Sequence, residues 1–219
     1  MNTATDLLRH VELFKHMTDD QLLAVANQSS ELNFSKNSIL MSEGEVGESM
    51  YIIKSGLVKV FVSDDDGREL VLYEQGSGAV IGEISLLDDE PRSASVIALE
   101  PGTALRIGKP AFLNCLRMSP EMAINLIRSL TQRLRATTEG SRSLALDNVY
   151  RRLVDKLHEL AGEEQPPSLP KKYSHRDLGN MIGASREMVG KIMAELIKGG
   201  YVALRDGRIH ILRKFPHNW

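Results

Sequence analysis

The 219-residue chain is predicted to have an α+β fold, with an N-terminal β roll of jelly-roll type, one long helix and a C-terminal winged helix–turn–helix. Three observations lead to this prediction. Short β-branched runs separated by glycines fill residues 31–110, and apolar residues then recur at helical spacing over 120–146. Two capped helices followed by a hairpin end the chain. We place the domain boundaries at 1–118, 119–146 and 147–219.

The N-terminal segment is expected to be helical, because apolar residues recur at roughly helical intervals from about Asp6 to Ser29. Thr18, with Gln21 three residues later, resembles a capping box for the second part of this stretch. The first nine residues lack the apolar core of a signal peptide, and no apolar run approaches the roughly 20 residues of a membrane span. We therefore expect a cytoplasmic protein that does not associate with a membrane.

The β-rich region contains six short runs that are predicted to be strands. These runs are residues 39–41, 50–53, 57–62, 70–73, 95–98 and 104–107. Turn signals separate them every 8–12 residues or so, and Asp65-Asp66-Gly67 is typical of a hairpin turn. Spacing of this kind predicts an antiparallel sandwich or barrel.

The segment 82–94, Gly-Glu-Ile-Ser-Leu-Leu-Asp-Asp-Glu-Pro-Arg-Ser-Ala, carries the clearest chemical signal. It begins with a carboxylate, Glu83, at the start of a short helical turn, and ends with a guanidinium beside a hydroxyl, Arg92 and Ser93. A carboxylate can accept a hydrogen bond from a ribose hydroxyl, and the donor fork of arginine pairs with phosphate oxygens. The first N–H groups of the turn, on Ile84, Ser85 and Leu86, are suited to an anion. The segment therefore predicts a pocket for a cyclic nucleotide.

A long helix from about Pro120 to Leu146 is predicted to pair with a second copy of itself. Residues at alternating spacings of four and three form the pairing seam: Ala123, Ile127, Leu130, Leu134, Thr137, Ser141 and Leu144. The polar residues Thr137 and Ser141 weaken such a seam unless something bonds them, and a ligand at a homodimer interface would do so.

The C-terminal region reads as a helix–turn–helix followed by a β wing. Ser174, with Asp177 three residues later, marks a helix start, Gly183 occupies the tight turn, and Ser185 caps a second helix. A further amphipathic helix precedes this motif from about residue 149 to 160, and residues 162–170 form a polar, proline-rich loop.

The second helix of this motif presents Arg186, Glu187 and Lys191 on its outer face. In helix–turn–helix proteins the N-terminal residues of this helix reach base edges in the major groove, where arginine can grip guanine and glutamate can accept from cytosine. Arg205 and Arg208 flank the Asp206-Gly207 hairpin turn and suit contact with DNA phosphates.

Charge is divided unevenly along the chain. Residues 151–219 hold 13 Lys/Arg against 8 Asp/Glu, whereas the first 150 residues hold 14 against 21. The basic C-terminal part suits a polyanion such as double-stranded DNA. Cys115 is the single cysteine, so one chain has neither an internal disulfide nor a metal site built from several thiolates. We expect no metal and no covalent cofactor.

The motifs together resemble the catabolite-activator-type family, the CRP/FNR superfamily of transcription regulators, over nearly the whole chain. The resemblance implies that Glu83 binds the ribose hydroxyl and that Arg92 and Ser93 bind the cyclic phosphate. It places Thr137 against the purine of its own subunit and Thr138 against that of the partner. The implied ligand-binding set is Gly82, Glu83, Ile84, Ser85, Arg92, Ser93, Ala94, Arg133, Thr137 and Thr138.

The same resemblance implies that a homodimer binds a palindromic operator and contacts RNA polymerase. The implied DNA-binding set is Ser174, Ser185, Arg186, Glu187, Lys191, Arg205 and Arg208. Two positions depart from the best-known activator of the family: Lys191 replaces an arginine, and the loop at 163–171 is shorter. Arg92 followed by Ser-Ala is the pattern of cAMP-binding members, so cAMP is the expected effector.

Four alternatives remain open at this point. The same architecture could answer to cyclic di-GMP, since Arg92 and the acidic run 88–90 could serve either ligand, or it could bind DNA without a ligand. An enzyme acting on cyclic nucleotides would need a paired His/Asp metal cluster or a phosphate-binding Gly-x-x-x-x-Gly-Lys loop, and the sequence has neither. A ligand-binding subunit with no DNA role would have no use for the winged helix.

Overall fold

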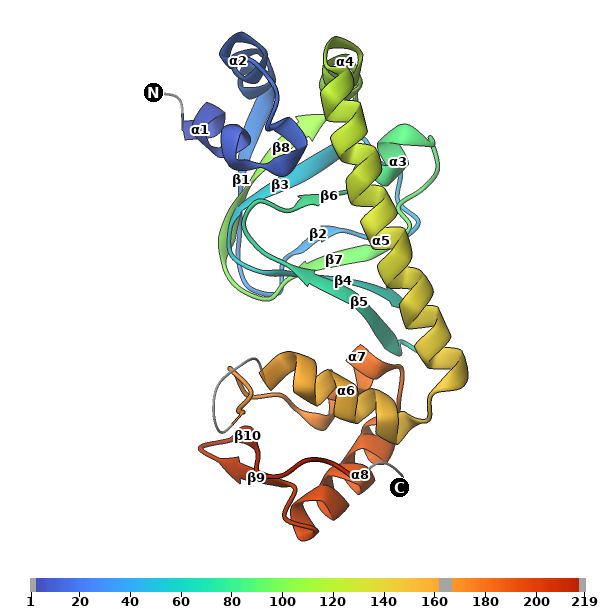
Figure 1. Cartoon of the computed structure of the whole chain (residues 1–219). Coiled ribbons are helices and arrows are strands. Elements are labelled where there is room, and N and C mark those ends of the chain that lie inside the picture. The colour runs from blue at the N-terminus through green and yellow to red at the C-terminus, as the bar shows by residue number, and fades with distance from the viewer. Residues whose placement is uncertain (1–2, 162–166, 217–219) are drawn as a thin grey trace. The chain divides into compact units, whose positions relative to one another are not determined.

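The computed structural model of the chain describes residues 3–161 and 167–216. The chain forms two compact units, one made of residues 1–62 and 72–135 and the other of residues 63–71 and 136–219. The predicted fold class is confirmed, because a β-sheet domain, a long helix and a helix–turn–helix follow one another along the chain (Figure 1). No helix of the described residues has the length and apolar character that crossing a membrane requires.

The first unit opens with helix α1 (Thr3–His10), a 3₁₀ turn (Glu12–Phe14) and helix α2 (Asp19–Asn27). The predicted capping box is confirmed: the Thr18 hydroxyl accepts from the backbone N–H of Gln21, and the Gln21 side chain accepts from the backbone N–H of Thr18 at 2.9 Å. The helical stretch predicted from residue 6 to 29 is interrupted after α1, because Val11 has an extended backbone (φ −83°, ψ 124°).

Two four-stranded sheets form the body of this unit, in the orders β1-β8-β3-β6 and β2-β7-β4-β5. The first sheet consists of β1 (Ser29–Phe34), β8 (Gly102–Gly108), β3 (Ser49–Ser55) and β6 (Val80–Ile81), and the second of β2 (Ile39–Met41), β7 (Ser95–Ala98), β4 (Val58–Ser63) and β5 (Glu69–Gln75). All six predicted strands are confirmed. β1 and β6 were not predicted, because β1 carries only two large apolar residues and β6 is two residues long.

The space between the two sheets is filled by apolar side chains from both, among them Phe34, Ile53, Val60 and Val96. A second cluster lies on the other face of the first sheet, where Met50 and the neighbouring apolar residues pack against helices α1, α2, α4 (Lys109–Met118) and the first part of α5 (Pro120–Leu146). The bounds of α5 agree with the predicted long helix. α4 was not predicted, although Pro110 stands in its first turn, where proline is well tolerated.

Helix α3 (Ile84–Leu87) is a single turn inserted between β6 and β7. Glu83 is its N-cap residue, and Gly82 directly before it has a φ of +79° that favours glycine. This backbone bend turns the chain from the sheet into the helix, and Glu83 and Ser85, which follow it, are buried.

The second unit contains α6 (Val149–Ala161), α7 (His175–Ile182), α8 (Arg186–Lys198), β9 (Val202–Arg205) and β10 (Arg208–Ile211). The predicted helix–turn–helix and wing are both present. Gly183 ends α7 in the left-handed region (φ +63°), and Asp206 and Gly207 both have positive φ in the turn of the antiparallel hairpin. One apolar cluster joins all five elements, with Leu153, Leu178, Val189 and Leu196 fully buried.

Arg152 of α6 donates to four backbone carbonyls, those of Ile182 and Gly183 at the turn of this motif and those of Leu144 and Asp147 before α6. Its Nε donates to the carbonyl of Ile182 at 2.9 Å, and its Nη1 donates to that of Asp147 at 2.7 Å. The carbonyl at the end of α7 therefore has a charged donor. Most of the predicted proline-rich loop, residues 162–166, lies outside the described residues.

Candidate functional site

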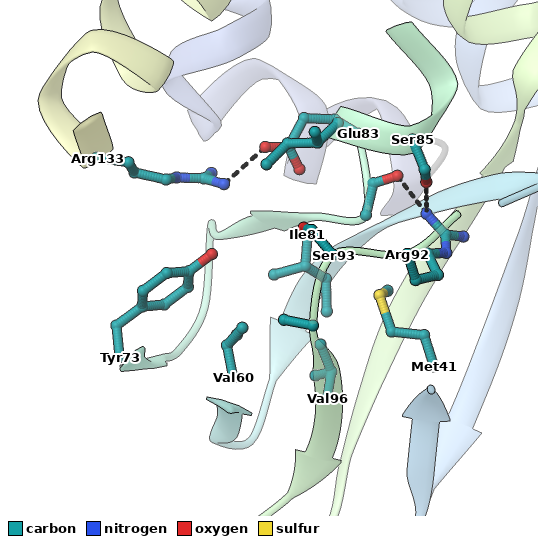
Figure 2. A pocket seen from close by; sticks show the side chains of 13 residues that line it. Met41, Val60, Tyr73, Ile81, Glu83, Ser85, Arg92, Ser93, Val96 and Arg133 are labelled. Carbon is teal, nitrogen blue, oxygen red and sulfur yellow. Dashed lines mark hydrogen bonds and ion pairs between the residues drawn. The ribbon is translucent and has the colours of Figure 1, made fainter. Parts of the chain in front are cut away.

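The predicted nucleotide segment lines a hollow in the first unit with about 370 Å³ of open space, part of which opens to solvent (Figure 2). Every residue at its wall belongs to this unit: Met41, Val60, Tyr73, Ile81, Gly82, Glu83, Ile84, Ser85, Arg92, Ser93, Ala94, Val96 and Arg133. Eight of the ten predicted ligand-binding residues are therefore brought together at one place.

Arg92 is 6% exposed and is held by neutral oxygens. One terminal nitrogen, Nη1, donates to the Ser85 hydroxyl at 2.7 Å and to the backbone carbonyl of Gly82, and the other, Nη2, donates to the carbonyl of Ser49. Among the described residues no carboxylate forms an ion pair with it, so its charge is not neutralised by direct contact. Arginine has five N–H donors, and these three bonds leave donors for an anion.

The electrostatic cost of this arrangement falls on the guanidinium itself. Burial lowers the pKa of Arg92 from its ordinary value, while Tyr51, Glu83 and Glu45 act in the opposite direction. The ordinary value lies so far above neutrality that the side chain stays charged. A buried cation without a contacting anion favours the binding of one, which is the property that a phosphate site needs.

Glu83 is 1% exposed, and its two carboxylate oxygens have different surroundings. Oε1 accepts from Nη1 of Arg133 at 2.6 Å, whereas Oε2 is buried and has no hydrogen-bond partner among the described residues. Buried polar atoms are nearly always paired, so an orphan carboxylate oxygen at the wall of a hollow indicates a missing donor. A ribose hydroxyl is such a donor.

Arg133 reaches the hollow from α5. Besides its ion pair with Glu83, it donates through Nη2 to the backbone carbonyl of Val80 at 2.9 Å. Its guanidinium carbon lies 5.8 Å from the centre of the Tyr73 ring, within the range of a cation–π contact. The long helix is thus attached directly to the carboxylate that the sequence predicts to bind the ribose.

Two glycines leave the room that Arg92 and Ser85 occupy. A Cβ at Gly47 would lie 2.2 Å from the Ser85 hydroxyl oxygen, and a Cβ at Gly82 would lie 2.7 Å from Nη1 of Arg92. Neither neighbour is the loose end of an exposed chain, since both are buried. Glycine at these positions leaves the space that the Arg92 guanidinium and the Ser85 hydroxyl fill.

The remaining predicted ligand residues differ in how they lie. Ser93 is exposed at the wall of the hollow, and Ala94 is buried. Ser85 was predicted to offer a backbone N–H, but its side chain has a clear structural task, because its hydroxyl accepts from Arg92. The N–H of Leu86 already donates to the carbonyl of Glu83 at 3.1 Å. Of the three predicted amide donors, this one is therefore engaged within the turn.

Thr137 and Thr138 are exposed on α5 and belong to the second unit. The position of that unit relative to the hollow is not determined, so their predicted contacts with a purine stay predictions. The seam residues Ile127, Leu134 and Leu144 are likewise exposed, as a surface for helix pairing requires.

The second unit carries the predicted DNA-binding residues. Both predicted caps are present: the Ser174 hydroxyl accepts from the N–H of Asp177 at 3.1 Å, and the Ser185 hydroxyl accepts from the N–H of Met188 at 3.2 Å. Every member of the predicted set is exposed: Ser174, Ser185, Arg186, Glu187, Lys191, Arg205 and Arg208. The N-terminal turn of α8 thus presents a cation and a carboxylate to solvent, where bases could be read.

Sequence reasoning missed Tyr73, which lines the hollow, and two residues that support Arg92 and Ser85 from behind the wall, Ser49 and Gly47. Ser49 acts through its backbone carbonyl and Gly47 through the absence of a side chain, and neither property leaves a signal in a sequence motif. Tyr73 was predicted only as part of a strand, although a half-buried aromatic residue near the end of a strand is a signal that could have been noticed. Among the described residues, no three His, Cys, Asp or Glu side chains gather as a metal site requires.

In comparisons with known proteins, one family model matches the β-sheet region and another matches the helix–turn–helix region. Residues 31–119 match the model of the cyclic nucleotide-binding domain, and residues 151–214 match that of the Crp-like helix-turn-helix domain. A Mycobacterium tuberculosis protein named "CRP-like cAMP-activated global transcriptional regulator" is 28% identical over 211 residues, covering 94% of each chain. A Thermus thermophilus protein named "Cyclic AMP receptor protein" is 31% identical over 169 residues, covering 77% of each.

A solved structure of similar fold is that of "the c-di-GMP Responsive Global Regulator CLP" of Xanthomonas campestris. It matches 90% of this chain and 100% of its own with a TM-score of 0.78 and 24% sequence identity. At this identity the likeness concerns the fold.

Proposed function

The chain belongs to the CRP/FNR superfamily and is a cyclic-nucleotide-binding, DNA-binding transcription regulator, and from this premise we propose that it is a homodimer switched by cAMP. The division of work follows the predicted domains: residues 1–118 bind the nucleotide, 119–146 form the dimer, and 147–219 bind DNA. The function is regulatory, and no catalytic step is assigned to the chain.

The observation that carries this proposal is that a carboxylate oxygen without a donor and a buried guanidinium without a contacting anion lie in one hollow. Oε2 of Glu83 lacks a donor among the described residues, and Arg92 is a buried cation without a contacting anion. A 3′,5′-cyclic nucleotide supplies both partners at once, because its ribose carries a 2′-hydroxyl and its phosphate one negative charge. Ser93 at the wall adds a hydroxyl to the phosphate, and Ser85 holds the guanidinium in place.

The choice of cAMP rests on the Arg92-Ser93-Ala94 pattern and on the relatives. The Mycobacterium tuberculosis and Thermus thermophilus proteins are both named for cAMP, and their similarity extends over 94% and 77% of this chain. Arg133 donates to Glu83, which supports its assignment to the ligand site, and we propose that Thr137 and, across the dimer, Thr138 complete the site around the purine.

DNA binding is proposed to follow the general geometry of helix–turn–helix dimers. The N-terminal turns of the two α8 helices would enter successive major grooves about 34 Å apart, which calls for a palindromic operator. We assign Arg186, Glu187 and Lys191 to base edges, and Arg205 and Arg208, with Ser174 and Ser185, to the phosphate backbone. Contact with RNA polymerase is part of the same proposal.

Isothermal titration of the full chain with cAMP, cGMP and cyclic di-GMP tests the effector, followed by DNA binding at one stated salt concentration with and without each nucleotide. The expected result is that cAMP binds most tightly and that it alone stimulates operator binding. Stimulation by cyclic di-GMP would replace the effector and keep the architecture. Operator binding that no nucleotide alters would overturn the switch and favour a ligand-independent regulator.

A further inference from the structure

Tyr73 lies in the hollow at the end away from Arg92. It projects from β5, and Figure 2 shows its hydroxyl pointing into the open space, with Arg133 above it and Val60 beside it. Among the described residues of the first unit, Tyr73 and Arg133 carry the polar side chains at this end of the hollow, and Arg133 is engaged with Glu83. The neighbouring wall is apolar, formed by Val60, Ile81 and Val96.

The phenol is neutral and has a hydrogen to donate. Burial raises the pKa of Tyr73, and the nearby Arg133 offsets this only in part. Arg133 carries donors and no acceptor, so it can approach the phenol oxygen but cannot take the phenol hydrogen. No hydrogen-bond acceptor lies against this hydroxyl in the described residues.

The two anchors at the other end decide which part of a nucleotide reaches Tyr73. With the cyclic phosphate at Arg92 and Ser93 and the ribose hydroxyl at Glu83, the base would lie toward Tyr73, which Figure 2 shows on the other side of the hollow from Arg92. Val60 and Val96 line the hollow between Tyr73 and the side where Arg92 lies, so this part of the wall is apolar (Figure 2). The flat faces of a purine suit an apolar wall, and its unprotonated ring nitrogens are hydrogen-bond acceptors.

We propose that the Tyr73 hydroxyl donates a hydrogen bond to a ring nitrogen of the bound purine, which makes Tyr73 a further ligand-contacting residue that recognises the base. The inference rests on the proposed function, since it assumes a cyclic nucleotide in this hollow. Adenine and guanine both carry ring nitrogens that accept, at positions 3 and 7, so the contact recognises a purine without choosing between the two.

The test combines removal of the phenol oxygen with removal of the acceptor on the ligand. Titrations of the full-length wild type and of Tyr73→Phe use cAMP, 3-deaza-cAMP and 7-deaza-cAMP, in which one ring nitrogen is replaced by carbon. Tyr73→Phe is expected to bind cAMP about 2- to 10-fold more weakly, the usual effect of one hydrogen bond. One deaza analogue should show a similar loss with the wild type and little further loss with the variant.

Tyr201→Phe is the matched control, because it removes the same atom from a tyrosine of the second unit that does not line the hollow. Its cAMP affinity should equal that of the wild type. Wild-type affinity for cAMP in Tyr73→Phe, or an equal loss with all three ligands, would overturn the inference. The wild-type series is informative by itself, since unchanged binding of both deaza analogues would also overturn it. A wild type that binds no cyclic nucleotide would instead show the proposed function to be wrong.

Discussion

One carboxylate oxygen of Glu83 accepts from Nη1 of Arg133 at 2.6 Å, while the other is buried without a hydrogen-bond partner among the described residues. The two residues are 50 positions apart, on α5 and at the start of α3. The first unit ends at residue 135, so this ion pair fixes the last turn of α5 that belongs to the β roll. Whatever binds Glu83 therefore acts on a residue that is already attached to the long helix.

Replacing Arg133 by leucine is expected to lower the free energy of unfolding of the first unit by about 1.5–3 kcal/mol, because a buried carboxylate loses its charged partner. Urea unfolding followed by circular dichroism measures this loss. The addition of Glu83→Gln to the same chain should recover part of it, since a neutral amide needs no charged partner. Losses that simply add in the double variant would show that the pair is not coupled.

Arg92→Leu should abolish nucleotide-stimulated DNA binding while the chain still folds, because it removes the buried cation that we assign to the phosphate. Fluorescence anisotropy with a labelled operator, at fixed salt and with or without cAMP, measures the stimulation. Arg106→Leu is the matched control: Arg106 is exposed, donates to the Ser49 hydroxyl at 3.0 Å and does not line the hollow. Stimulation that persists in Arg92→Leu would remove the pocket assignment.

Gly82→Ala should weaken cyclic-nucleotide binding by displacing Arg92, since the new Cβ would lie 2.7 Å from Nη1. Gly78→Ala separates this effect from backbone strain, because Gly78 also has a positive φ (+86°) but no atom within 4 Å of a Cβ. Both variants should lose stability, and only Gly82→Ala should also lose affinity at a temperature where both are folded. Equal affinity of the two variants in a calorimetric titration would contradict the displacement.

Glu187→Ala is expected to relax base preference at one step of each half-site by about 1–3 kcal/mol, the usual worth of one good base contact. Competition binding against operators with single base changes measures the preference. Glu195→Ala provides the comparison, because Glu195 is exposed on the same helix but lies toward its C-terminal end. A Glu187→Ala protein that discriminates as sharply as the wild type would exclude this glutamate from base reading.

Cys115 should resist thiol reagents while the protein is folded. The thiol is 6% exposed, and burial raises its pKa above the ordinary value, so the reactive thiolate is scarce. The thiol has a higher pKa in the folded protein than in the unfolded chain. Its contribution to stability is therefore fully present below the ordinary thiol pKa and is lost as the pH rises through the raised pKa of the folded state. Reaction with an aromatic disulfide at pH 8 should be slow until denaturant is added, and rapid labelling of native protein would contradict it.

Local patterns were sufficient for the elements with strong sequence signals. The capping box at Thr18, the helix start at Ser174, the left-handed Gly183 and the Asp206-Gly207 turn were all predicted, because each depends on chemistry within a few residues. The strands β1 and β6 were not, since a short or polar strand is defined by its neighbours in the sheet and not by its own residues.

The sequence by itself determined the fold class, the family and the nature of the chemical groups: a carboxylate, a guanidinium and a hydroxyl on one short segment, and an arginine–glutamate pair at the start of a capped helix. Only the tertiary structure decided how those groups are held. It showed that Ser85 and the carbonyl of Ser49 support Arg92, that Arg133 takes one oxygen of Glu83, and that Tyr73 lines the opposite end. The reason is physical: these hydrogen bonds join residues that are 7, 43 and 50 positions apart, and spacing along the chain does not contain the distances between them in space.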